Sequence, residues 1–124
     1  MFEGYDALAE TPAHELALEC LRAGIEAASP RRAVEKHCSV ADGTFRIRDA
    51  EYDLSAYDAI EIVGGGKAAD DLAAAFESLL GDRITGGVVV TNERTAAPER
   101  VTVLEGEHPT PGEGSVSGSK AVRS

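Results

Sequence analysis

The first third of the chain carries the hydrophobic spacing of two successive helices. One set of apolar residues recurs at intervals of three and four, which places its members on one side of a helix: Leu18, Leu21, Ile25 and Ala28. Thr11-Pro12 can start this helix and Ser29-Pro30 can start another, because Ser and Thr cap free amides and proline suits the first helical position. The pattern predicts helices over about residues 11–28 and 30–37.

A strand-like alternation follows. Phe45 and Ile47 alternate with Arg46 and Arg48, behind a turn signal at residues 42–43. We therefore predict a small hairpin at about residues 40–57.

From about residue 58, short apolar runs alternate with a helical pattern. The apolar runs cover residues 59–63, 88–90 and 101–104. Helical spacing lies between the first two runs, at Ala69, Leu72, Phe76 and Leu79, and Gly81 ends it. Because strands separated by a helix favour parallel pairing, we predict an α/β fold with a mainly parallel sheet.

Composition and charge narrow the classes of function. The 124 residues suffice for one domain, and the 43% hydrophobic content is in the globular range. A net charge of -10 repels nucleic acids and anionic membrane surfaces, so neither is an expected partner. The acidic excess, with lysine only at Lys36, Lys67 and Lys120, indicates adaptation to high salt, where self-repulsion is screened. An ordinary acidic cytosolic protein is the alternative.

The predicted location is the cytoplasm. No apolar run approaches the ~20 residues that span a bilayer, and the N-terminus is acidic where a signal peptide would be basic. Cys20 and Cys38 have neither CxxC nor zinc-ligand spacing, so they are expected to be free thiols.

The strongest candidate for chemistry is a glycine-rich loop between the predicted strand and helix. It consists of Gly64, Gly65, Gly66 and Lys67. Free amides at a helix start attract phosphate or carboxylate, glycines let an oxyanion approach the backbone, and Lys67 adds a positive charge. The loop is neither a P-loop, because Glu61 and Ala68 replace its first glycine and its Ser or Thr, nor a full GxGxxG motif. A plain turn is the alternative, but a lysine at a helix start opposes the dipole by roughly 0.3–1 kcal/mol, which favours a bound anion.

Other candidates follow the next two strands. His108 stands in a polar loop past a strand end, the side on which open α/β sheets bind ligands, and it can donate to an anion or transfer a proton. Thr91-Asn92 ends the preceding strand on the same side and can hydrogen-bond a ligand, although such residues also serve as ordinary turns. Ser115 or Ser117 can cap a final helix. The acidic residues of the 69–82 segment are expected to be solvated and have no metal-ligand spacing: Asp70, Asp71, Glu77 and Asp82.

Three segments carry a family resemblance. They are Ile-Val-Gly-Gly-Gly-Lys-Ala-Ala at 62–69, Gly-Asp-Arg-Ile-Thr-Gly-Gly-Val-Val-Val at 81–90 and Glu-His-Pro-Thr-Pro at 107–111. In this order and spacing the chain resembles the N-terminal portion of the glycerate 2-kinase family, which also contains homologues labelled hydroxypyruvate reductase. The resemblance covers about residues 11–122, only the first quarter to third of the family's length. Together with the acidic composition it indicates a haloarchaeal member.

The resemblance implies a Rossmann-like α/β/α three-layer domain with N-terminal helices packed on it. Residues 1–124 would form an incomplete first domain, with a helical lead-in at about 11–37, the hairpin at about 40–57 and an α/β core at about 58–124; the second domain would be absent from this chain. The implied activity is ATP-dependent, Mg²⁺-requiring transfer of a phosphoryl group to the 2-hydroxyl of D-glycerate, giving 2-phosphoglycerate.

The resemblance also implies roles for particular residues. Lys67 matches an active-site lysine of the family, and His108 matches its His-Pro-x-Pro loop. Gly64, Gly65 and Gly66 would contact substrate or phosphate with His108. Gly112 departs from the family, whose loop has Asp there.

The chain by itself is expected to be inactive, because the base and the adenine pocket would come from sequence it lacks. One alternative is a non-catalytic small anion-binding α/β domain of 124 residues. Another is a truncated gene product without function. The sequence specifies no oligomeric state.

Overall fold

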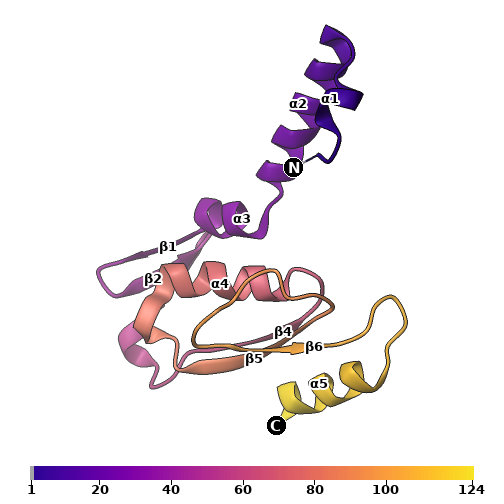
Figure 1. Cartoon of the computed structure of the whole chain (residues 1–124). Helices are drawn as coiled ribbons and strands as arrows, with labels where there is room; N and C mark the ends of the chain where they lie inside the picture. Colours follow the sequence, from indigo (N-terminus) through magenta and orange to yellow (C-terminus); the bar gives the residue numbers. More distant parts are fainter. Residues whose placement is uncertain (1) are drawn as a thin grey trace.

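A computed structural model describes residues 2–124 and has an α/β architecture. Three parallel strands form the central sheet in the order β4-β5-β6: β4 (Glu61–Gly65), β5 (Gly86–Thr91) and β6 (Thr102–Glu105). Helix α4 (Ala69–Leu80) lies on one face of this sheet and α5 (Glu113–Arg123) on the other (Figure 1). The predicted α/β class with three layers is confirmed.

The core lies between the sheet and α4. Ala73 of α4, Val89 of β5 and Ile84 in the connection between them are at most 1% exposed. As predicted, α4 ends at Gly81, whose φ of 59° suits glycine, and a short 3-10 turn, η2 (Gly81–Arg83), leads to β5. The strand, helix and strand predicted from spacing are therefore the centre of the fold.

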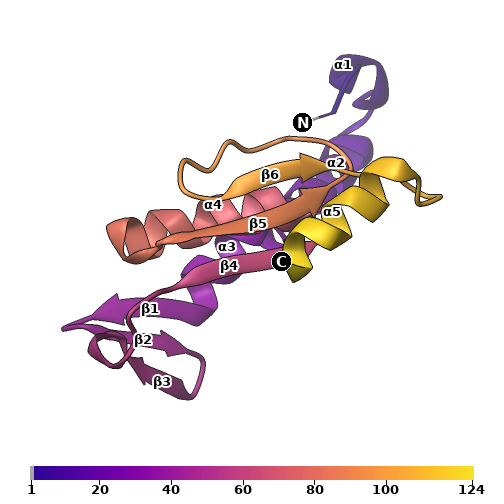
Figure 2. The same cartoon turned by 90° about the horizontal axis from the view of Figure 1, so that it is seen from below.

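Helix α5 packs closely against the opposite face of β5 (Figure 2). A Cβ atom at Gly118 would lie 2.7 Å from Cγ2 of Val90, so only glycine permits this approach. The helix begins at Glu113 after Gly112, earlier than a cap at Ser115 or Ser117 would allow. The close approach brings the first turns of α5 to the ends of β5 and β6.

The N-terminal region contains three helices: α1 (Tyr5–Leu8), α2 (Pro12–Ala27) and α3 (Pro30–His37). The Thr11 hydroxyl accepts the His14 amide at 3.2 Å, and the Ser29 hydroxyl accepts the Arg32 amide at 3.4 Å. Both predicted helix starts are thus confirmed. Val34 of α3 is 5% exposed, and α3 packs on α4.

The packing of α2 differs from the expectation that both N-terminal helices lie on the α/β layers. In Figure 1, α2 projects away from the rest of the molecule, and it packs against α3. Leu16, Leu21 and Ile25 are 51–66% exposed. The cause is local: Ser29 is extended (ψ 144°) before Pro30, and this break turns α2 away from α4.

The predicted hairpin is a three-stranded antiparallel sheet in the order β1-β2-β3: β1 (Cys38–Ala41), β2 (Thr44–Ile47) and β3 (Ala50–Asp53), followed by a 3-10 turn, η1 (Leu54–Ala56). The second turn was missed because Arg48, not a glycine, takes the positive φ (51°) there. Phe45 of β2 stacks edge-on against Phe76 of α4, with ring centroids 6.4 Å apart, and so anchors this sheet. No helix within residues 2–124 is long and apolar enough to cross a membrane.

Candidate functional site

A cavity of about 220 Å³ opens at the carboxyl ends of the three parallel strands. Its walls come from the loops that follow β4, β5 and β6 and from the first turns of α5. Six of the candidate binding residues predicted from the sequence line it: Gly65, Gly66, Lys67, Thr91, Asn92 and His108. Parallel strands end at one edge of their sheet, which is why residues distant in sequence meet here.

Two predicted residues are less available to a ligand in this cavity. Gly64 is a residue of β4 and lines a second hollow between this strand and α4, which Gly65, Gly66 and Lys67 also line. Thr91 lies in the cavity wall, but it is only 2% exposed and its hydroxyl is 3.0 Å from the Glu93 carbonyl oxygen. Asn92, next to it, is exposed and lines the cavity. Of this pair, Asn92 is therefore the one available to a ligand.

The loop between β4 and α4 is shaped by Gly66. Its amide donates to the Val90 carbonyl at 2.9 Å, and its φ of 131° lies in the region that favours glycine. Helix α4 then starts after Ala68, which has no side chain to cap the first amides. The loop thus leaves the positive end of α4 without a cap from its own N-cap residue, beside the exposed side chain of Lys67.

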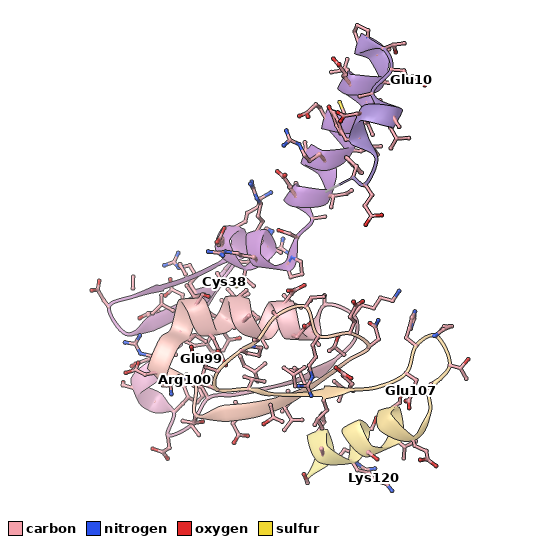
Figure 3. The ribbon with its side chains drawn as sticks, viewed as in Figure 1. Glu10, Cys38, Glu99, Arg100, Glu107 and Lys120 are labelled. Atoms are coloured by element: carbon pink, nitrogen blue, oxygen red, sulfur yellow. The ribbon has the colours of Figure 1, made fainter. Side chains whose placement is uncertain are left out.

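The loop after β6 is held by Glu107, a residue that the sequence reasoning did not single out. Figure 3 labels Glu107 where this loop approaches the start of α5. The carboxylate accepts the amides of Gly112 (3.2 Å), Gly114 (3.1 Å) and Ser115 (2.9 Å), and the Ser115 hydroxyl at 3.0 Å. The hydrogen bonds from the Ser115 and Gly114 amides lower the pKa of Glu107 to about 2. His108 follows directly, and its peptide bond to Pro109 is cis.

The expectation that the acidic residues of the α4 region are solvated is wrong for Asp70 and Glu77. Asp70 is fully buried, and its Oδ2 accepts the amides of Thr95 (2.6 Å) and Ala96 (2.9 Å). Burial raises the pKa of Asp70, but these hydrogen bonds outweigh it and the net pKa is below the ordinary value. The Glu77 carboxylate accepts the amides of residues 99, 100 and 101 at 2.7–2.9 Å.

A sequence signal for these two carboxylates exists. Asp70, Ala73, Glu77 and Leu80 follow each other at intervals of three, four and three, so they share one side of α4. Ala73 and Leu80 are buried, and the two carboxylates therefore face inward. There they bind the amides of the segment between β5 and β6.

The described residues do not fit a magnesium site. Within residues 2–124, no three His, Cys, Asp or Glu side chains gather to hold a metal ion. The carboxylate that lines the cavity, Glu107, already accepts four hydrogen bonds. A magnesium ion would need ligands from outside this set.

The fold and the cavity together define a class of protein. This is an α/β protein with a small cavity at the carboxyl edge of a parallel sheet, where a helix start without a side-chain cap, a lysine and a histidine can receive an anion. The chain belongs to the family described as "Domain of unknown function (DUF4147)", which matches residues 16–124.

The chain is similar in sequence to a kinase and to a protein described as a reductase. The chain is 32% identical over 111 residues to a glycerate 2-kinase of Pyrococcus horikoshii, covering 89% of this chain and 24% of that protein. It is 37% identical over 62 residues to "Putative hydroxypyruvate reductase" of Agrobacterium vitis, covering 49% of this chain and 14% of that protein. The chain thus spans about a quarter or less of the length of these relatives.

Solved structures agree with the fold. A crystal structure of a Pyrococcus horikoshii OT3 protein matches 89% of this chain and 24% of its own, with 31% identity and a TM-score of 0.72. A glycerate kinase of Thermotoga maritima matches 87% of this chain and 23% of its own, with 28% identity and a TM-score of 0.60. None of these organisms bears on a haloarchaeal origin or salt adaptation, which stays a prediction from composition.

Proposed function

We propose that this chain is the N-terminal part of a glycerate 2-kinase, which transfers the γ-phosphoryl group of ATP to the 2-hydroxyl of D-glycerate. Its cavity holds an anionic group of the reactants, either the glycerate carboxylate or the transferring phosphoryl. The observation that carries the proposal is that Lys67 and His108, from separate loops, line one cavity at the uncapped start of α4. The kinase names of the relatives support it.

The residues can act by binding and orientation. The amides at the start of α4 and the Lys67 ammonium would hold negative charge, and His108 can donate a hydrogen bond to the same group. Phosphoryl transfer depends mainly on positioning and charge stabilisation, which such groups supply. No described side chain is assigned here as the base for the 2-hydroxyl.

The size of the cavity favours a small anion. Its volume of about 220 Å³ is below the roughly 300–1,000 Å³ of pockets that enclose drug-sized ligands. The adenosine part of ATP would therefore bind elsewhere, and we propose that a second domain supplies its pocket and the ligands for Mg²⁺. On this proposal the 124 residues alone bind an anion without turnover.

The reductase name of one relative suggests a different chemistry. Gly64, Gly66 and Ala69 meet the spacing of a dinucleotide fingerprint only in its variant with Ala at the last position, a spacing that many chains meet by chance. Incubation with NADH and hydroxypyruvate tests this alternative directly, and oxidation of NADH would favour it.

The three lysines of the chain allow a matched binding test. Titration of the 124-residue protein with inorganic phosphate and with D-glycerate should shift the NMR signals of Gly65, Gly66 and Lys67. Lys67→Ala should weaken binding roughly ten- to hundred-fold, because a hydrogen bond to a charged group contributes about 1.5–3 kcal/mol. Lys36→Ala removes the same charge from the exposed surface of α3 and should bind as the parent does. Equal binding by both variants would refute the role of Lys67.

A further inference from the structure

Two helix starts border the proposed anion cavity, and they differ in how their amides are occupied. The start of α4 follows Ala68, which provides no side-chain hydrogen bond. The start of α5 follows Gly112, which also provides none, but the carboxylate of Glu107 sits on its first amides. The first amides of α5 are therefore bonded to a carboxylate, whereas α4 has Asp70 and Asp71 in its first turn, and Asp70 Oδ2 is bonded to the amides of Thr95 and Ala96 instead.

The amides of Gly112, Gly114 and Ser115 form a cradle that fits closely around the Glu107 carboxylate. A Cβ atom at Gly112 would lie 2.7 Å from the Glu107 carboxyl carbon. At Gly114 a Cβ atom would lie 3.2 Å from both carboxylate oxygens and 2.8 Å from the Glu105 carbonyl oxygen. With the Ser115 hydroxyl as a further donor, glycine at both positions lets the backbone close around Glu107.

The same contacts fix the loop that carries His108. Glu107 and Ser115 are also joined through the backbone of Glu107, whose amide donates to the Ser115 hydroxyl at 3.0 Å and whose carbonyl oxygen lies 3.3 Å from the same hydroxyl. These bonds close residues 107–115 into a loop whose two ends are tied together at the cavity. His108 is the residue next to this tie, so its backbone direction depends on it.

We propose that Glu107 is a positioning residue of the anion site: it keeps a ligand's negative charge at the start of α4 by filling the start of α5, and it holds His108 at the cavity. The proposal rests on the proposed function of the cavity. A phosphate or carboxylate group would be repelled by Glu107 and would find the α5 amides already bonded. The start of α4, with Lys67, is then the remaining place for it.

Phosphate titration of the isotope-labelled chain tests this assignment. In the parent, inorganic phosphate should shift the amides of Gly65–Lys67 and the ring of His108. In Glu107→Ala, the response of the His108 ring should fall at least five-fold, and the amides of Gly112, Gly114 and Ser115 should begin to respond. A merely structural loss would not create a phosphate response at α5.

Glu113→Ala is the matched control, because Glu113 is an exposed carboxylate in the first turn of the same helix. It should respond to phosphate as the parent does. The proposal is overturned if Glu107→Ala responds like the parent, or if Glu113→Ala produces the same changes as Glu107→Ala.

Two further outcomes separate the inference from its premises. If phosphate fails to shift the amides of Gly65–Lys67 in the parent, the proposed function fails. A new response at Gly112–Ser115 in Glu107→Ala would still support the claim that the Glu107 carboxylate keeps phosphate off the first amides of α5. If Glu107→Ala does not fold, hydrogen exchange of the parent decides instead. Slow exchange of the Gly112, Gly114 and Ser115 amides supports the cradle, and exchange at the unprotected rate overturns it.

Discussion

Gly87→Ala is expected to push β5 away from β4, the strand that leads into the loop of Lys67. Gly87 has a φ of 147°, and a Cβ atom there would lie 2.0 Å from the carbonyl oxygen of Ile62 and 2.7 Å from its nitrogen. These atoms belong to the paired strand β4, so the methyl group cannot be accommodated unless β4 and β5 move apart. Backbone strain of about 1–3 kcal/mol and overpacking of about 1–3 kcal/mol give a loss of roughly 2–6 kcal/mol.

Urea unfolding followed by circular dichroism measures this loss. With a slope of about 1–3 kcal/mol per molar urea, the midpoint should fall by at least about 0.7 M. Gly86→Ala is the matched control, because a Cβ atom at Gly86 meets nothing within 4 Å. If the two variants unfold within about 0.5 kcal/mol of each other, the argument from the Ile62 contact is refuted; this margin is about that of ordinary surface substitutions.

Three other perturbations test the buried and capping contacts. Asp70→Ala should lower the unfolding free energy by about 1–3 kcal/mol more than Asp71→Ala, because it removes a buried acceptor from the amides of Thr95 and Ala96; equal losses in urea unfolding would contradict this. The depressed pKa of Glu107, about 2, means that its contribution to stability is complete above the ordinary value of 4.5 and is lost as the pH falls toward 2. The parent should therefore lose more stability than Glu107→Gln between pH 6 and pH 2.5, and parallel pH profiles would contradict the assignment. Gly118→Ala should cost about 1–3 kcal/mol by overpacking, whereas Gly24→Ala, in open space on α2, should gain up to about 1 kcal/mol; a neutral Gly118→Ala in thermal unfolding would refute the close approach.

Local signals in the sequence were sufficient for the parts of the fold that local chemistry decides. Thr11 and Ser29 cap the helices they were expected to cap, and Gly81 ends α4. The parallel sheet was predictable because a helix of this length between two apolar runs leaves few other connections. From that sheet it followed that the loop of Lys67 and the loop of His108 share one edge, and both line the cavity.

Features that depend on tertiary packing were missed. The apolar stripe of α2 predicted a buried face, but the break at Ser29-Pro30 sends the helix away from the sheet, and a stripe alone does not specify what covers it. The start of α5 was placed at a serine because Ser is a good cap. The actual cap is supplied by Glu107 from outside the helix, where no local rule would look.

Three acidic residues have structural roles that the amino-acid composition does not reveal. The acidic residues of the 69–82 segment were expected to be solvated, yet Asp70 and Glu77 each accept two or more backbone amides from a neighbouring segment, and so does Glu107. Asp70 and Glu77 fix the segment between β5 and β6, and Glu107 fixes the loop of His108. These carboxylates would be needed at any salt concentration, so they do not count toward salt adaptation. Glu107 stays ionised, but its hydrogen bonds hold it at the start of α5, and Lys67 is the lysine that lines the cavity and can attract an anion to a strongly acidic chain.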